Sequence, residues 1–325
     1  SFNFYINEGG NLKLIRKNSY AVSIGGFYSM ITKLLGFRPT RHEGKITGLA
    51  AFGKHTELVD KFNDLWKYKN DILQRFPFEN LEKEWKNLRI DDELSYSEKI
   101  NFTNASGGIS NDYSKRNHII YKWLKINTNG FTKEDIAYAC QKTAENITLN
   151  EIKRVIKEHK LNDVSISLAG GVFANVRINQ LIYELDGINN IYVQPAMGDS
   201  GISLGNAILA DLKKSNCDNF ENKYNFSHTY LGPDYSLDLK DFIEEFKDDN
   251  ILFRKMDNPS DEVASLLTQN KIIGFWNGRL EWGPRALGNR SILLNTFDRK
   301  VNDVLNKRLN RTEFMPFAPV VLDFM

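Results

Sequence analysis

The chain has 325 residues, of which 41% are hydrophobic, and its 43 lysines and arginines nearly balance 41 aspartates and glutamates. The length accommodates two domains with a buried core, while the charge balance excludes bulk attraction to nucleic acid or an anionic membrane. No apolar run is long enough to span a bilayer. The two cysteines lie far apart, which argues against a disulfide framework or a zinc cluster and favours a cytoplasmic location.

The first part of the chain predicts a hairpin, two helices and a long insertion. The strand-like runs FNFYI and LKLI flank a turn signal at residues 8–11. Apolar side chains recur at helical spacing over residues 23–36, and a loop at 38–42 leads into a short helix through 48–51. Residues 56–125 are charged and low in small residues, so we interpret them as a mostly helical insertion that covers or flanks a site.

From Thr132 onward, helices and strands alternate in a manner typical of an α/β layer. Thr132 begins a long helix with a capping-box pattern. The strand VSISL leads into Gly170-Gly171 and a helix, and the strand IYVQP leads into Gly198-Asp199-Ser200-Gly201 and another helix. The polar, irregular residues 213–229 then predict a domain linker.

A second α/β segment is expected over residues 230–325. It comprises a strand ILFRKM, a helix from about Ser260, a strand KIIGFWNG, a helix over roughly 300–310 and the apolar run FMPFAPVVL. The chain starts within one strand-like run and stops directly after another, so we expect it to be a fragment.

Two glycine motifs are candidate ligand sites. In the first, Gly170 and Gly171 lie between a strand and a helix, where backbone N–H groups can approach a ligand closely, and Asn175 could bind a ribose or a base edge. The alternative is a tight turn that only packs strand on helix. In the second, Asp199 at the end of a strand could ligate a metal or orient phosphates, and the alternative is a helix N-cap.

Residues 41–45, Arg-His-Glu-Gly-Lys, place donors, an acid and a base next to a glycine. His42 could act as a donor, a base or a metal ligand, although a single histidine can equally be a structural hydrogen-bonding group. Glu43 and Lys45 could equally be solvated charges at a helix end.

The strongest motif is GRLEWGPRALGNRSIL over residues 278–293. It holds Arg279, Arg285 and Arg290 among glycines directly after a strand. Arginine favours bidentate capture of phosphate or carboxylate, and glycines keep a loop open to a ligand. The alternative is a set of structural salt bridges with Glu281, Asp298 or Glu313.

Five blocks of the sequence resemble the NodU/CmcH/TobZ family of O-carbamoyltransferases. In chain order they are RHEGKITGLAAFG, SLAGGVFANVRIN, QPAMGDSGISLGNA, GRLEWGPRALGNRSIL and FMPFAPVVL. The arginine block is highly specific, whereas the Gly-Gly and Gly-Asp blocks are shared with tRNA threonylcarbamoyl transferases and other actin-like proteins. The resemblance covers essentially the whole chain, although residues 56–125 match only loosely.

The resemblance implies an α/β fold in two parts. Residues 1–212 would be the C-terminal portion of an actin-like ATPase (ASKHA) domain similar to threonylcarbamoyl transferase, and residues 230–325 the N-terminal portion of a YrdC-like domain. It also implies an enzyme that forms carbamoyl adenylate from carbamoyl phosphate and ATP. The carbamoyl group would pass to a hydroxyl of a sugar, aminoglycoside or lipo-oligosaccharide type of acceptor, with a divalent metal such as Fe(II), and with Mg for ATP. No nucleic acid or membrane partner is expected, and a homodimer is the default expectation.

The same block matching implies roles for individual residues. Asp199 would be a metal ligand, and His42 and Lys45 would be catalytic, with His42 as the candidate base. The residues implied to bind carbamoyl adenylate are Glu43, Gly44, Gly170, Gly171 and Asn175. Those implied to bind carbamoyl phosphate and the nucleotide phosphates are Arg279, Arg285, Asn289 and Arg290.

One departure from the family pattern concerns its His-x-x-x-His metal motif, because none of the five histidines has that spacing. We therefore expect this chain alone to hold incomplete metal and ATP sites and to be inactive.

Two other functional classes stay open. A tRNA threonylcarbamoyl transferase-like enzyme leaves the arginine block unexplained, and no basic stripe suited to tRNA is visible. A non-catalytic nucleotide-binding actin-like module is the other.

Overall fold

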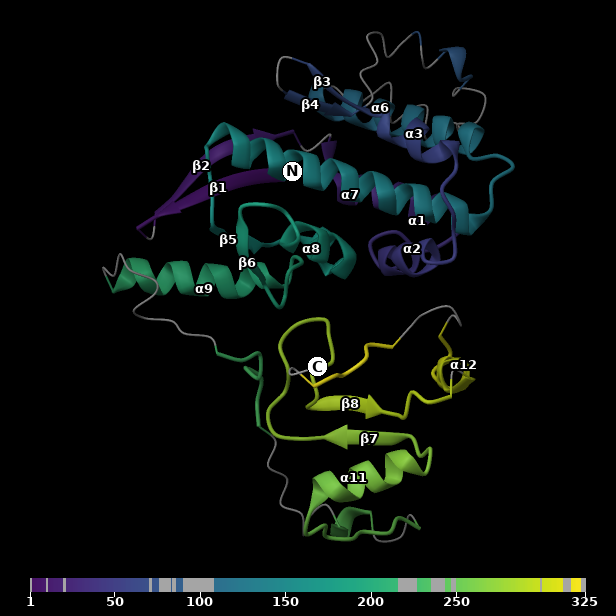
Figure 1. Cartoon of the computed structure of the whole chain (residues 1–325), viewed down its shortest axis with the longest axis vertical. Coiled ribbons are helices and arrows are strands. Elements are labelled where there is room, and N and C mark those ends of the chain that lie inside the picture. The colour runs from purple at the N-terminus through teal and green to yellow at the C-terminus, as the bar shows by residue number, and fades with distance from the viewer. Residues whose placement is uncertain are drawn as a thin grey trace. The chain divides into compact units, whose positions relative to one another are not determined.

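The computed structural model describes residues 2–9, 11–19, 22–69, 72–75, 83, 86–89, 108–215, 227–234, 243–246, 250–298, 300–311 and 317–322. The chain divides into two compact units, Ser1–Val193 (unit 1) and Gln194–Met325 (unit 2) (Figure 1). Helices occur in both units, together with two-stranded sheets, which confirms the predicted mixed α/β class. The linker expected over 213–229 stays a prediction, since residues 216–226 lie outside the described ranges.

Unit 1 opens with the predicted hairpin. Strand β1 (Phe2–Glu8) pairs antiparallel with β2 (Asn11–Asn18), with an irregularity in register between Phe4 and Tyr5. Helix α1 (Ile24–Leu34) follows, and the Ser23 hydroxyl caps its first turn by accepting the N–H of Gly26 at 3.2 Å. The predicted helix over 23–36 is therefore confirmed.

The next segment differs from the prediction in two respects. Helix α2 (Glu43–Ala50) begins earlier than the short helix expected through 48–51. The insertion is not simply helical, because α3 (Glu57–Asn63) is followed by an antiparallel hairpin of β3 (Trp66–Lys69) and β4 (Ile72–Arg75) before α6 (Gly108–Asn127). Trp66 and Leu73 are buried, and the burial of these aromatic and aliphatic side chains stabilises strands within an otherwise charged stretch.

Helix α7 (Lys133–Glu158) is the centre of unit 1. Thr132 caps it by accepting the N–H of Asp135 at 3.1 Å, as its sequence predicted. Helices α1, α2, α3 and α8 (Val176–Tyr183) all pack against it. Its predicted apolar face is buried in this contact, and the buried residues of that face are Ile136, Cys140, Ala144, Ile147, Ile152 and Val155.

A buried carboxylate also ties the two hairpins to α7. Glu151 is fully buried and accepts hydrogen bonds from Asn18 Nδ2 at 2.9 Å and from Tyr68 Oη at 2.5 Å. Arg16 lies 3.9 Å from the same carboxylate. Burial, followed by the hydrogen bond to Glu151, raises the pKa of Tyr68 well above its ordinary value, so this phenol stays a donor.

The C-terminal part of unit 1 carries the first glycine motif. Strand β5 (Val164–Leu168) pairs in parallel with β6 (Ile188–Val193), and the connection between them contains the 3-10 turn Gly171–Ala174 and α8. The predicted alternation of strand, glycine turn, helix and strand is thus confirmed over this stretch.

Unit 2 contains α9 (Gly201–Lys214), α11 (Pro259–Thr268), β7 (Ile273–Trp276), β8 (Arg290–Leu293) and α12 (Lys300–Arg308). Strands β7 and β8 pair antiparallel, so the arginine block is the loop of a hairpin. The strand expected over ILFRKM is wrong, because residues 251–256 form no regular element and Leu252 is 98% exposed. No described helix combines the length and the apolar character needed to cross a bilayer.

Gly53 tests how closely the segment that follows α2 approaches α7. A Cβ at Gly53 would lie 2.1 Å from the carbonyl oxygen of Glu134 and 2.8 Å from Cβ of Tyr138. We expect Gly53→Ala to lower the free energy of unfolding by about 1–3 kcal/mol, the usual cost of overpacking, measured by chemical denaturation. Gly25→Ala is the control, since its new methyl would meet Val172 Cγ2 at an ordinary 3.4 Å. Equal effects of the two substitutions would contradict the close approach.

Candidate functional site

The RHEGK motif forms the entry to α2. His42 directly precedes the helix, and its Nδ1 accepts the backbone N–H of Arg38 at 3.2 Å. The Glu43 carboxylate accepts the N–H of Thr40 at 2.5 Å and the hydroxyl of Ser29 at 2.9 Å. Because the Nδ1 lone pair is used, this hydrogen bond assigns the proton of a neutral His42 to Nε2. The ring then offers a hydrogen-bond donor rather than a basic lone pair at Nε2.

Gly44 and Lys45, which follow shortly after His42, differ in what surrounds them. A Cβ at Gly44 would have no atom within 4 Å, so a ligand could approach this backbone. The ammonium group of Lys45 lies 5.4 Å from the ring centroid of Phe37. Lys45 is therefore held by a cation–π contact on the first turn of α2.

The Gly-Gly turn is open on its outer side. Gly170 has a φ of 122°, a conformation that favours glycine, and Gly171 begins the 3-10 turn. An added Cβ would meet only Phe173 Cδ2 at 4.0 Å from Gly170, and nothing within 4 Å from Gly171. Both glycines are exposed, so their backbone is accessible to a ligand.

Asn175 faces the interior of unit 1. Its Oδ1 accepts the N–H of Ile178 at 3.2 Å and so caps α8, and its Nδ2 donates to Gln141 Oε1 at 2.7 Å. Nδ2 also lies 3.4 Å from the oxygens of Tyr28 and Thr47. The amide thus contacts four helices, α1, α2, α7 and α8, and a contact with ribose stays a prediction.

These contacts belong to a buried polar network. Gln141 accepts from the Tyr28 hydroxyl and donates to Glu145 at 2.8 Å, and Lys142 pairs with Glu145 at 2.7 Å. Burial is the main cause that raises the pKa of Tyr28 well above its ordinary value, so its hydroxyl stays protonated. Through Thr47 and Asn175, the network joins α2, which carries the RHEGK motif, to the Gly-Gly turn. The structure thereby brings together two motifs that are far apart in the sequence.

In unit 2, Asp199 lies on the turn before α9. Helix α9 begins after Ser200 without a side-chain cap, which does not support the alternative that Asp199 caps it. Asp199 is exposed, and its carboxylate makes no hydrogen bond within the described part of the chain. No group of three or more histidine, cysteine, aspartate or glutamate side chains gathers among the described residues as a metal site requires. Asp199 is therefore a single candidate ligand.

Arg290 fixes the loop of the β7–β8 hairpin from inside. Its NH1 donates to the carbonyls of Asn277 at 3.0 Å and Asn289 at 2.8 Å, and its NH2 donates to the carbonyl of Gly278 at 2.9 Å. The guanidinium carbon also lies 3.6 Å from the ring centroid of Trp276. Arg290 thus braces the main chain, and its partners are carbonyls rather than the acidic residues considered as an alternative.

Two further side chains hold the same loop. The Glu281 carboxylate accepts the N–H of Leu287 at 2.8 Å and of Asn289 at 2.6 Å. Asn289 is 8% exposed and donates from Nδ2 to the carbonyl of Arg279 at 2.8 Å. Glu281 and Asn289 therefore organise the loop backbone on which the other arginines are carried.

Arg279 differs from Arg290 in what its guanidinium does. Its Nε donates to the carbonyl of Gly232 at 3.0 Å, which fixes the direction of the side chain. Its two terminal nitrogens have no hydrogen-bond or ion-pair partner among the described residues, and the residue is exposed. Arg285 is also exposed on this loop. The terminal guanidinium edge of Arg279 is thus available to an anion.

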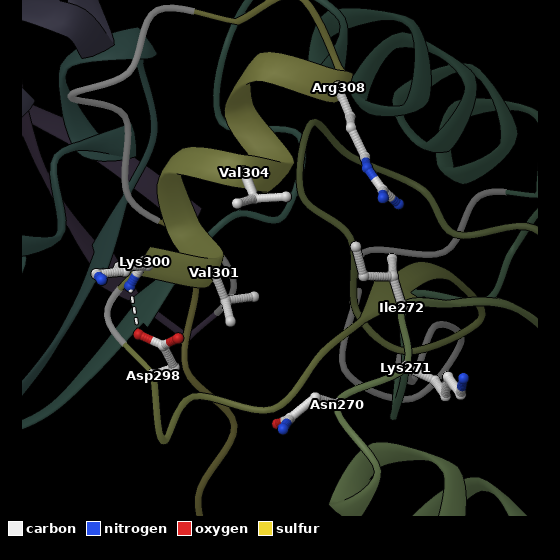
Figure 2. Close-up of a pocket in the computed structure, with 8 residues that line it drawn as sticks. All are labelled: Asn270, Lys271, Ile272, Asp298, Lys300, Val301, Val304 and Arg308. Carbon is white, nitrogen blue, oxygen red and sulfur yellow. Dashed lines mark hydrogen bonds between the residues drawn. The ribbon is translucent and has the colours of Figure 1, made fainter.

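Unit 2 also has a pocket of about 440 Å³ that the sequence reasoning missed (Figure 2). Val301 and Val304 of α12 face Ile272 across it, and the guanidinium of Arg308 extends toward the same opening. Asp298 accepts the N–H of Lys300 at 2.9 Å at one edge. The pocket is lined by Asn270, Lys271, Ile272, Asp298, Lys300, Val301, Val304 and Arg308, none of which was a predicted site residue.

A double-mutant cycle tests the buried network of unit 1. Asn175→Ala removes both the cap of α8 and the partner of Gln141, and Gln141→Ala removes the other side of that bond. We expect a coupling energy of about 0.5–3 kcal/mol in the free energy of unfolding, because the residues share one buried hydrogen bond. Strictly additive effects of the two substitutions would show that the bond contributes nothing.

A second measurement tests the brace made by Arg290. Arg290→Ala removes a donor from three carbonyls, of which that of Asn289 keeps the N–H of Asn277, and we expect a loss of about 2 kcal/mol in the stability of the hairpin. Hydrogen exchange of the amides over 277–289 should accelerate accordingly. Arg254→Ala, which removes an ion pair with Glu262 at the surface, is the control and should leave these amides unchanged.

Comparison with known proteins identifies the family. The family model described as the carbamoyltransferase N-terminus matches residues 2–208, and that of the carbamoyltransferase C-terminus matches residues 264–324. The chain is 31% identical over its whole length to the uncharacterized protein MJ1051 of Methanocaldococcus jannaschii, and it covers 56% of that protein.

Two relatives carry functional names. Nodulation protein NolO of Bradyrhizobium diazoefficiens is 27% identical over 67% of the chain and 40% of its own length. The 3'-hydroxymethylcephem-O-carbamoyltransferase of Amycolatopsis lactamdurans is 29% identical over 47% of the chain and 27% of its own length. The chain spans about half the length of the curated relatives that it matches over most of its residues. The two family matches, in order and over most of its length, show that the chain belongs to the carbamoyltransferase family.

Proposed function

We propose that the protein forms carbamoyl adenylate from carbamoyl phosphate, ATP and water, with release of phosphate and pyrophosphate, and transfers the carbamoyl group to a hydroxyl of a small-molecule acceptor. The observation that carries this proposal is the pair of carbamoyltransferase matches, which include the RHEGK and Gly-Gly blocks in one and the arginine block in the other. The name of the cephem relative gives O-carbamoylation as that protein's reaction. An actin-like fold for the first part and a YrdC-like fold for the second belong to the same proposal.

The chemistry explains why an adenylate is needed. The carbamoyl carbon is a weak electrophile, and attachment to AMP gives it a good leaving group. The acceptor oxygen attacks this carbon, the new C–O bond forms, and the bond to the AMP phosphate oxygen breaks. The acceptor proton leaves to solvent water, since Nε2 of His42 already carries a proton, and negative charge develops on the departing phosphate. The protein must therefore hold phosphate groups and position a hydroxyl.

Arg279 is the residue that we propose for direct phosphate binding. Its Nε is held by the Gly232 carbonyl, and its terminal nitrogens can donate two parallel hydrogen bonds to an oxyanion. Arg285 shares the loop and is proposed to bind the same anions. Arg290 and Asn289 are positioning residues, because their side-chain donors are directed to main-chain carbonyls.

In unit 1, the open backbone at Gly44, Gly170 and Gly171 supports adenylate binding by main-chain groups. Asn175 holds the Gly-Gly turn against α7 and acts through that turn. We propose His42 as a donor from Nε2, because its Nδ1 is occupied by the Arg38 N–H. Glu43 orients this loop through its bonds to Thr40 and Ser29, and Lys45 supplies positive charge beside it.

The proposal includes a divalent metal, Fe(II), with Mg accompanying ATP. Such a metal would neutralise charge as the phosphate departs. Asp199 is an exposed carboxylate suited to ligate it, yet one carboxylate does not make a site and the described residues supply no cluster around it. We therefore assign no step to the metal.

Arg279→Ala is the sharpest test of this function. In the protein expressed from its complete gene, we expect the substitution to reduce carbamoyl adenylate formation by about 100-fold, since the charged donors to the phosphate are lost. Arg279→Lys should recover part of the rate, because it keeps the charge and loses the fork. Adenylate is detected by mass spectrometry and pyrophosphate release with ATP and carbamoyl phosphate.

Arg254→Ala is the matched control, since it removes an exposed guanidinium outside the loop. If the wild-type protein binds ATP but forms no carbamoyl adenylate, the proposal fails and a non-catalytic nucleotide-binding module is the better description. Unchanged activity in Arg279→Ala would remove Arg279 from the phosphate site.

A further inference from the structure

Two aromatic rings of unit 1 each carry a pair of lysine ammonium groups. Lys33 and Lys125 lie 4.9 Å and 5.2 Å from the ring centroid of Tyr121. Lys45 and Lys133 lie 5.4 Å and 6.0 Å from the ring centroid of Phe37. The rings thus hold four cations from α1, α2, α6 and the start of α7 at fixed places on the protein.

Arg38 and Arg41 extend this group along the loop between α1 and α2. We call the six residues the basic surface, and they are Lys33, Arg38, Arg41, Lys45, Lys125 and Lys133. Five of them are exposed, and none pairs with a carboxylate in the described part of the chain. Residues 33–42 and 121–133 contain no aspartate or glutamate, whereas the whole chain has a net charge of only +2.

Three carboxylates lie in the first turns of α2 and α7, those of Glu43, Glu134 and Asp135, and none forms an ion pair with the basic surface in the described part of the chain. Glu43 accepts hydrogen bonds from Thr40 and Ser29, which are uncharged. Asp135 is buried and accepts the N–H of Lys54 at 3.0 Å. These three carboxylates offset part of the charge, but the six cations outnumber them, so the basic surface keeps a net positive charge.

Helix electrostatics do not account for all of these lysines. Lys33 and Lys125 lie in the last turns of α1 and α6, where a helix favours cations. Lys133 is the first residue of α7 and Lys45 the third of α2, where the helix dipole disfavours a positive charge. The same first turns hold Glu43, Glu134 and Asp135, which offset these two cations in part, and an anionic ligand would be attracted by both the ammonium groups and the helix N-termini.

The basic surface lies next to the RHEGK motif. His42 and Glu43 lie between Arg41 and Lys45 in the sequence, and α2 packs against both α1 and α7. In Figure 1, α2 lies next to the end of α7 that follows α6. A ligand held by these cations would therefore be close to the loop that carries His42.

We propose that the basic surface binds the carbamoyl acceptor, which is an anionic small molecule of the phosphorylated, sulfated or carboxylated sugar type. The inference rests on the proposed function and adds the charge of its substrate. A single-stranded nucleic acid is the weaker candidate, because each ring already carries two ammonium groups and a base would have to displace them to stack.

The test compares binding of glucose 6-phosphate, glucose 6-sulfate and glucose to the complete protein by calorimetry and ligand-observed NMR. We expect both anionic sugars to bind and glucose not to bind, with affinity that falls as salt is raised from low to physiological concentration. The variant Lys33→Gln/Lys125→Gln/Lys133→Gln should weaken binding of the anionic sugars by about tenfold or more.

Lys157→Gln is the matched control, because it removes a lysine from the other end of α7 and should leave binding unchanged. Thermal unfolding verifies that the variants are folded, and the single substitutions Lys33→Gln and Lys125→Gln serve if the triple variant is not. Equal binding of glucose, or no change in any lysine variant, overturns the inference. Tighter binding of a short RNA through the same lysines also overturns it.

The outcome is separable from that of the proposed function. Sugar binding needs no turnover, so it decides the inference even in the absence of ATP. Failure of the wild-type protein to form carbamoyl adenylate overturns the proposed function, whatever the sugars do. Adenylate formation with no binding of any anionic sugar overturns the inference alone.

Discussion

The arrangement of unit 2 around its candidate site depends on the hydrogen bonds from Arg290 to three main-chain carbonyls. A loop rich in glycine has no preferred shape of its own, because glycine gains little from any one backbone conformation. Arg290 fixes the two ends of this loop to each other while stacking on Trp276, and Glu281 and Asn289 fix its middle. Arg279 can present an ordered guanidinium edge only because these other side chains hold the backbone.

A comparable constraint operates in unit 1, where α7 supplies a buried polar network as well as a hydrophobic face. Gln141 and Glu145 are on the same helix one turn apart and are hydrogen-bonded to each other. Gln141 also accepts hydrogen bonds from Tyr28 and Asn175, and Glu145 pairs with Lys142. Buried polar groups must be hydrogen-bonded, so the network requires α1, α2 and the Gly-Gly turn to take one relative position. Fixing these elements leaves the glycine backbone and the entry to α2 as open surfaces.

The sequence predicted the parts of this structure that local patterns determine. The first hairpin, the Thr132 cap, the apolar face of α7 and the Gly-Gly turn all follow from spacing within a few residues. The β3–β4 hairpin was missed because Trp66 and Leu73 lie in a segment whose overall charge favours a helix. The strand expected at ILFRKM failed because strand formation depends on a partner, and a short apolar run does not identify one.

The candidate site was predictable to a lesser degree, for a physical reason. The sequence identifies Arg290 and Asn289 as donors, but it does not show that main-chain carbonyls far along the loop receive them. Lys33 and Lys125 are likewise far apart in the sequence, although the ammonium groups of both lie over the ring of Tyr121. Side-chain chemistry can be read from residue types, whereas the direction of each donor is a property of the tertiary structure.

Arg290 and Arg279 have different roles, one bracing the loop and the other presenting its guanidinium edge. This difference shows how a nearly neutral chain can place positive charge. A guanidinium that donates to carbonyls keeps its charge, so Arg290 still contributes positive potential to the loop that it braces. The chain can therefore concentrate attraction for anions at a few places without a high net charge, which would repel the compact state from itself. Under the proposed function and the further inference of an anionic acceptor, the protein must distinguish two anionic groups, the phosphates of the adenylate and the charge of the acceptor. Forked arginine donors on a braced loop suit the directional geometry of a phosphate, and lysines held over aromatic rings suit a charge recognised mainly by its field.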